Sequence, residues 1–239
     1  MIIPENSYFK DPPIFINPEL VLVLNAIRCS VEICEISYIR LVKLLSDSTE
    51  NPKVDEYEFS GIYLEAWSII NNSVIFRNIL LEHFEVDKQD SLFAQLNKAK
   101  ELRNTYQHID ERITEVLAKK ELPVFGTLSW FKRYPDSNKA IFCSTYSGSF
   151  TLKNLPKVTF SNIKDENLNN HIQKIELSSV IRKPKNKFEN SIIYISTIMY
   201  DLSELIKILD YNLKEYYKDE DDKKRHRSDL IIKLKGKMV

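Results

Sequence analysis

Glycine is scarce in this chain, where it occupies four of 239 positions. Tight hairpin turns and phosphate-cradling loops both need glycine, because it adopts positive backbone φ angles at little cost. Such scarcity argues against a fold of many short hairpins and against a nucleotide-hydrolysing enzyme with a phosphate-binding loop. It favours long helices.

Cysteine is also rare, and an excess of charge of one sign is absent. The cysteines, Cys29, Cys34 and Cys143, match neither a disulfide framework nor a zinc site, so we expect reduced thiols, no metal and no cofactor. The 34 basic side chains balance the 34 acidic ones, so the whole molecule has no electrostatic preference for nucleic acid or a membrane. Without a basic leader or a long unbroken apolar run, we expect a cytoplasmic protein with no membrane partner.

Apolar residues recur at helical spacing in several long segments. The predicted helices span residues 17–46, 61–84, 90–120 and 190–217. Asn17 is suited to cap the first, with Pro18 at its first position, and Asp90 is suited to cap the third. The polar segment 46–58 is predicted to be a loop.

Between the third and fourth predicted helices, short β-branched and aromatic runs alternate with turn-forming segments, which is typical of strands. The predicted strands span residues 124–131, 140–144, 157–160 and 174–180. We therefore predict a single mainly α, α+β domain over residues 1–239. Its parts are a four-helix bundle (17–120 and 188–217), a small antiparallel β insertion (121–187) and a charged C-terminal tail (218–239).

The third predicted helix carries the segment Arg103-Asn104-Thr105-Tyr106-Gln107-His108. Asn104 and His108 lie four residues apart, so a continuous helix turns both outward, in one stripe with Glu101, Arg112 and Glu115. Arg103 lies at the border of that stripe. Cleavage of RNA by its 2′-hydroxyl needs a proton acceptor and a cation that stabilises the phosphate, tasks that suit histidine and arginine.

This segment resembles the Arg-x(4–6)-His motif of the HEPN superfamily, including the polar residue directly after the arginine. The similarity covers the helical parts, about residues 18–120 and 188–217. It implies a HEPN-like bundle, a homodimer that forms the active site through the third helix, and metal-independent endoribonuclease activity. The catalytic residues it implies are Arg103, Asn104 and His108.

The biological role stays open between a toxin held by an antitoxin protein, a defence effector, and a non-catalytic module that binds protein or RNA. Asp110 stands where some toxins of the superfamily have a tyrosine that an antitoxin modifies. The resemblance therefore does not imply control by that route.

The β insertion carries an excess of positive charge. Lys132 and Arg133 lie within the aromatic segment 130–134, a pattern that suits single-stranded RNA. With Arg112, they are the predicted substrate-binding residues. The same pattern fits a sheet edge protected by lysine, and both interpretations stay open.

Overall fold

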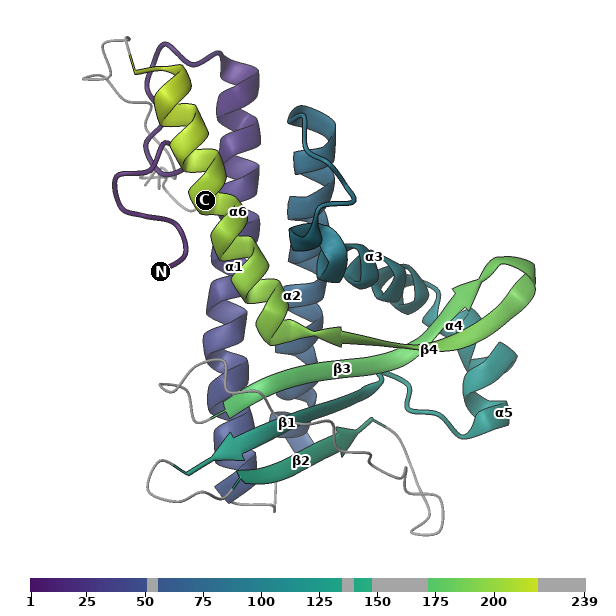
Figure 1. Cartoon of the computed structure of the whole chain (residues 1–239). Coiled ribbons are helices and arrows are strands. Elements are labelled where there is room, and N and C mark those ends of the chain that lie inside the picture. The colour runs from purple at the N-terminus through teal and green to yellow at the C-terminus, as the bar shows by residue number, and fades with distance from the viewer. Residues whose placement is uncertain (51–55, 135–139, 148–171, 219–239) are drawn as a thin grey trace, which may run out of the picture.

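The computed structural model of the chain describes residues 1–50, 56–134, 140–147 and 172–218 (Figure 1). The predicted strand 157–160 and nearly all of the predicted tail lie outside these residues.

Long helices and one sheet make up the fold, which confirms the predicted α+β class. The helical elements are α1 (Pro18–Glu50), α2 (Glu56–His83), η1 (Ser91–Phe93), α3 (Ala94–Gln107), α4 (Ile109–Arg112), the π-helical turn η2 (Ile113–Leu117), α5 (Ala118–Lys120), η4 (Pro184–Asn186) and α6 (Ile195–Tyr216). The strands are β1 (Thr127–Arg133), β2 (Ala140–Tyr146), β3 (Ile172–Lys183) and β4 (Lys187–Tyr194).

Both predicted capping side chains make cap hydrogen bonds, although Asp90 caps the short 3-10 helix η1 that leads into α3, not α3 itself. The Asn17 side chain accepts a hydrogen bond from the backbone N–H of Leu20 at 2.8 Å, and the Asp90 side chain accepts one from Leu92 at 2.8 Å. These bonds satisfy backbone donors that have no partner within the helix.

The loop predicted over residues 46–58 is too long at both ends. α1 continues to Glu50 and α2 begins at Glu56. Ser48 and Thr49 bond back to the carbonyls four residues earlier, at 2.7 Å each, so hydroxyl groups that could favour a turn are used inside the helix.

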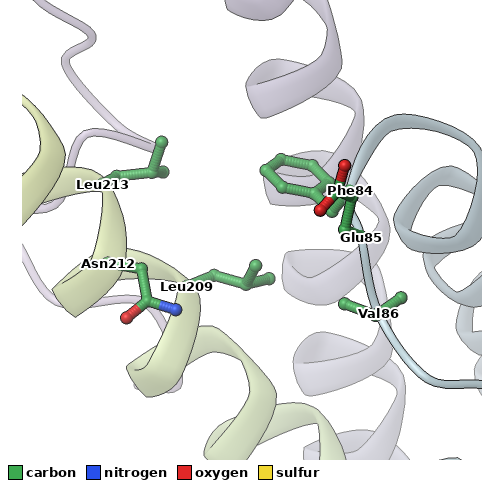
Figure 2. Close-up of a pocket in the computed structure, with 6 residues that line it drawn as sticks. All are labelled: Phe84, Glu85, Val86, Leu209, Asn212 and Leu213. Carbon is green, nitrogen blue, oxygen red and sulfur yellow. The ribbon is translucent and has the colours of Figure 1, made fainter.

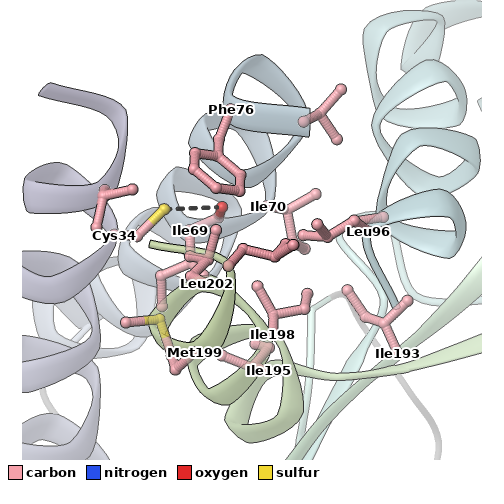
Figure 3. Close-up of a cluster of buried hydrophobic side chains, with 14 of the residues drawn as sticks. Cys34, Ile69, Ile70, Phe76, Leu96, Ile193, Ile195, Ile198, Met199 and Leu202 are labelled. Carbon is pink, nitrogen blue, oxygen red and sulfur yellow. Dashed lines mark hydrogen bonds between the residues drawn. The ribbon is translucent and has the colours of Figure 1, made fainter. Parts of the chain in front are cut away.

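The two longest helices form an antiparallel hairpin. The Ser37 hydroxyl donates to the Ser68 hydroxyl at 2.9 Å, and the thiol of Cys34 lies 3.5 Å from the Ile69 carbonyl oxygen (Figure 3). α3 packs against α2, and α6 returns across the hairpin to contact α1, α2 and α3 (Figure 1).

The sheet is antiparallel, with strand order β2-β1-β3-β4. Its buried side chains, among them Leu128, Trp130 and Ile193, belong to the same apolar cluster as the helices. Figure 3 shows Ile193 on the sheet side of that cluster, beside Ile198 and Leu96. The sheet therefore contributes to one shared core.

Residues 190–194, predicted as the start of the last helix, belong instead to β4, so the β region extends beyond residue 187. β4 pairs with β3 from Glu176↔Tyr194 to Lys183↔Lys187. β1 lies inside the sheet, so the interpretation of Lys132 as an edge-protecting lysine is wrong.

Candidate active site

The motif segment lies where α3 ends. The backbone N–H of His108 bonds to the carbonyls of Thr105 and Tyr106, and His108 has φ −115° and ψ 36°, which stops the helix at Gln107. Helical structure resumes as α4 and continues through η2 and α5. This helical run ends at Glu121, whose φ of 51° is left-handed. The predicted single helix over 90–120 is wrong at this point.

The break changes which side chains face outward. Arg112, predicted to lie in the exposed stripe, is only 4% exposed, whereas its neighbour Ile113 is 42% exposed. Neighbouring residues in a helix point about 100° apart. The exchange of exposure between Arg112 and Ile113 therefore shows that the helical turns after His108 are rotated about their axis by about one residue position relative to a continuation of α3. The outward stripe through Arg112 and Glu115 is therefore not formed.

An aromatic cluster holds the end of α3 in place. Tyr106 stacks on Trp67 of α2 and lies 5.8 Å, centroid to centroid, from Phe125, which precedes β1. The Trp67 indole N–H donates to the Phe125 carbonyl at 3.2 Å. The Tyr63 hydroxyl donates to the Thr145 carbonyl at 2.9 Å, and burial raises the pKa of this phenol to about 12.

The turn after Phe125 depends on glycine. Gly126 has φ +88°, and a Cβ atom placed there would lie 2.6 Å from the Ser178 carbonyl oxygen. Both the backbone conformation and the close approach of β3 exclude a larger residue. The turn that places Phe125 against Tyr106 therefore requires glycine at position 126.

His108 is exposed and lies beside a carboxylate. Its side chain is 57% exposed, and Nδ1 lies 3.5 Å from Oε1 of Glu111, slightly longer than a direct hydrogen bond. The other oxygen of Glu111 lies 3.7 Å from Arg112 and 3.9 Å from Arg182 of β3. One carboxylate thus connects the imidazole to two guanidinium groups.

Arg112 is a structural member of this charged group. It pairs closely with Glu115, which also lies 3.8 Å from Arg182. The guanidinium carbon of Arg112 lies 5.8 Å from the centre of the Phe188 ring on β4. Because these contacts occupy its buried side chain, the prediction that Arg112 binds substrate is not supported by its position.

Arg103 and Asn104 lie in the last turns of α3. Asn104 is exposed and Arg103 is half-buried. The Nε atom of Arg103 is buried without a hydrogen-bond partner among the described residues. This atom is closed to solvent, so a phosphate reaches the half-buried guanidinium only through its terminal nitrogens.

Lys132 was also predicted to bind substrate, but its ammonium group is occupied by contacts within the chain. It is 6% exposed, donates to the Ser46 hydroxyl at 3.2 Å and pairs closely with Glu50. It therefore anchors β1 to the end of α1. Arg133, the last residue of β1, is half-buried.

The sequence prediction missed Glu111 and Arg182 as neighbours of the motif. Glu111 stands three residues after His108, a spacing at which helical side chains meet, so this signal was present. Arg182 comes from β3, and only the packing of the sheet against α4 brings it to the site.

A pocket of about 220 Å³ lies between α6 and the segment that follows α2 (Figure 2). It is lined by Phe84, Glu85, Val86, Leu209, Asn212 and Leu213. Its mostly apolar lining contains no residue of the motif segment, so the pocket is not part of the candidate site.

Comparisons with known proteins add no assignment. No family model, no curated protein and no solved structure matches this chain. Over the described ranges, none of the helices has the length and apolar character needed to span a bilayer. In the same residues, no group of three or more His, Cys, Asp or Glu side chains is placed to hold a metal ion.

Proposed function

We propose that this chain is an endoribonuclease that cuts RNA without a metal ion, with His108 as proton acceptor and Arg103 as phosphate-binding cation. The observation that carries the proposal is the exposed imidazole of His108, whose Nδ1 lies 3.5 Å from Glu111. A carboxylate beside Nδ1 favours the tautomer that carries its proton there, and this leaves Nε2 as the acceptor.

In the proposed reaction, Nε2 takes the proton of the RNA 2′-hydroxyl while that oxygen attacks the adjacent phosphorus. The bond from phosphorus to the 5′-oxygen breaks, which gives a 2′,3′-cyclic phosphate and a 5′-hydroxyl end. Negative charge accumulates on the phosphate in the transition state, where the planar fork of Arg103 binds two oxygens. Asn104 donates a further hydrogen bond from its exposed amide.

The departing 5′-oxygen needs a proton, and a homodimer supplies a second imidazole for this step. In the proposed homodimer the second proton carrier is His108 of a second copy, paired across residues 104–111. A two-fold contact of this kind places both motifs in one cleft.

The alternative is a non-catalytic module that binds RNA or protein, and one observation favours its protein-binding form. Arg112 and Lys132 are buried in ion pairs, so two of the cations predicted to contact RNA are directed inward.

If the enzyme is a toxin or a defence effector, its expression should arrest growth. Restoration of growth by co-expression of a neighbouring reading frame would identify an antitoxin partner.

The test is cleavage of a synthetic single-stranded RNA in EDTA, with the product ends identified by mass spectrometry. His108→Ala should abolish cleavage, whereas the matched variant His83→Ala should retain it, both at the wild-type melting temperature. Undiminished cleavage by His108→Ala would overturn the assignment. Binding without cleavage would favour the non-catalytic module, and a loss in EDTA that Mg²⁺ restores would indicate a metal-dependent enzyme.

A further inference from the structure

The outer face of the α1–α2 hairpin carries exposed apolar side chains in a regular pattern. On α1, exposed positions follow one another at alternating steps of three and four residues. They are Glu19, Leu22, Ala26, Cys29, Ile33, Ile36, Arg40 and Lys43. This is the spacing of the contact positions in a coiled coil, and we call these residues the α1 seam.

The apolar members of the α1 seam are well exposed in the single chain. Leu22 is 69% exposed, Ile36 is 49% exposed and Ile33 is 41% exposed. The opposite face of α1, with Leu24 and Ile27, is fully buried against the rest of the fold. The seam is therefore an apolar surface in addition to the one that builds the core.

α2 widens this surface. Leu64 is 68% exposed and Ile75 is 40% exposed, and both lie at helical spacing from Ser68, which contacts Ser37 of α1. Arg40 of the seam lies 3.7 Å from Glu65, beside Leu64. Two adjacent helices thus present exposed apolar side chains next to one another.

We propose that a second copy of this chain binds the α1 seam, with the two α1 helices antiparallel around a two-fold axis. The charge order along the seam selects this partner, because Glu19 lies at one end and Arg40 and Lys43 lie at the other. Antiparallel pairing sets unlike charges together at both ends. Parallel pairing would set Glu19 against Glu19 and Lys43 against Lys43, which disfavours it.

Side-chain size and charge together select the register. With Cys29 opposite Ile33 of the second copy, the small Ala26 lies opposite Ile36 and Glu19 lies opposite Lys43. Each contact then occurs twice, as a two-fold interface requires. In this register Leu22 lies opposite Arg40, and the apolar pairs are formed by Ala26, Cys29, Ile33 and Ile36.

The seam contact does not rest on the proposed ribonuclease activity. α2 meets α1 through Ser68 and Glu65, and meets the end of α3 through Trp67. The seam and the His108 segment therefore lie on different sides of α2. A chain that pairs through both surfaces assembles beyond a dimer, and one that pairs through the seam alone is a dimer.

Light scattering on the purified chain over a range of micromolar concentrations tests the proposal. The double substitution Ile33→Glu with Ile36→Glu should halve the mass of the assembled species and leave the circular dichroism spectrum unchanged. Ile208→Glu is the matched control, because Ile208 of α6 is 48% exposed and lies outside the seam. A monomeric wild-type chain, or an assembly that survives the double substitution, would overturn the proposal.

Two further variants test the antiparallel register. Ile33→Cys should give a covalent dimer on mild oxidation, in which peptide mapping joins Cys29 of one copy to the new thiol at position 33 of the other. A dimer joined only through equivalent positions would show parallel helices and refute the arrangement. Glu19→Lys should weaken dimerisation about tenfold, and adding Lys43→Glu should restore it if the two residues meet.

Discussion

The rings of Trp67 and Tyr106 stack with their centroids 4.2 Å apart and their planes 19° from parallel. This contact joins the middle of α2 to the last turn of α3, just before the helix ends. Tyr106 lies inside the segment that resembles a catalytic motif, yet its ring packs against the protein. The position of His108 therefore depends on a contact made two residues earlier.

Replacing Tyr106 tests how strongly this stack contributes to stability. Tyr106→Ala should lower the free energy of unfolding by about 2 kcal/mol, less than the roughly 3–5 kcal/mol for a fully buried aromatic residue, because the ring is half-buried. Tyr106→Phe keeps the ring and should lower it by less than about 1 kcal/mol. Urea unfolding measures both, and equal losses would show that the hydroxyl group, not the stack, stabilises the site.

Glu111 and Glu115 offer a matched pair of variants around His108. Glu111→Ala removes the carboxylate beside Nδ1, so we expect a mixture of imidazole tautomers and roughly a tenfold or greater loss of RNA cleavage. Glu115→Ala removes the closest ion pair of Arg112 and should lower stability more, with the His108 tautomer unchanged.

The ¹⁵N chemical shifts of the imidazole report the tautomer without any assumption about activity. They therefore separate a positioning role of Glu111 from a general effect on the fold. The same tautomer in wild type and Glu111→Ala would show that this carboxylate does not orient the ring, whatever happens to cleavage.

Local signals in the sequence predicted the beginnings of the first and third helices. The caps at Asn17 and Asp90 depend on one side chain and a backbone N–H two or three residues later, so they can be inferred without knowledge of the fold. The antiparallel sheet followed from β-branched runs and turn residues in the same way.

Tertiary contacts decided what the sequence did not predict. Ile192, Ile193 and Ile195 fit a helix or a strand by spacing, and pairing of β4 with β3 settles the first two as strand. The break at His108 likewise follows no local glycine or proline. It accompanies the burial of Arg112 against Phe188, a contact between segments distant in the chain.

The ion pair of Lys132 predicts an asymmetric response to substitution. Lys132 is buried, whereas the Glu50 side chain is 60% exposed. Lys132→Met leaves a solvated carboxylate and should change the free energy of unfolding by less than about 1 kcal/mol. Glu50→Gln leaves a buried ammonium group without a counter-charge and should cost about 1–3 kcal/mol.

Chemical denaturation of the two variants measures this difference, and RNA binding by Lys132→Met provides a second readout. Affinity equal to wild type is expected, because the ammonium group is directed toward α1. A clear loss of affinity in a stable Lys132→Met protein would instead return this lysine to the RNA-binding surface.

Asp201 on α6 predicts a pH-dependent stability. Its side chain is 4% exposed, its Oδ2 has no hydrogen-bond partner among the described residues, and burial raises the carboxyl pKa to about 7. The unfolded chain releases this proton near pH 4 and the folded chain retains it to about pH 7. Folding is therefore favoured by this group at low pH, and that contribution is lost as the pH rises between these values.

A tenfold change in an ionisation equilibrium corresponds to about 1.4 kcal/mol, so the rise of the Asp201 pKa to about 7 should lower the free energy of unfolding by up to about 4 kcal/mol from pH 4 to pH 8. Asp201→Asn cannot ionise and should be the more stable protein at pH 8, with an advantage that shrinks toward pH 4. Urea unfolding of both proteins at several pH values isolates the contribution of Asp201 to stability, because the other titrating groups are common to both proteins. A difference that stays constant with pH would show that Asp201 ionises as readily in the folded chain as in the unfolded one.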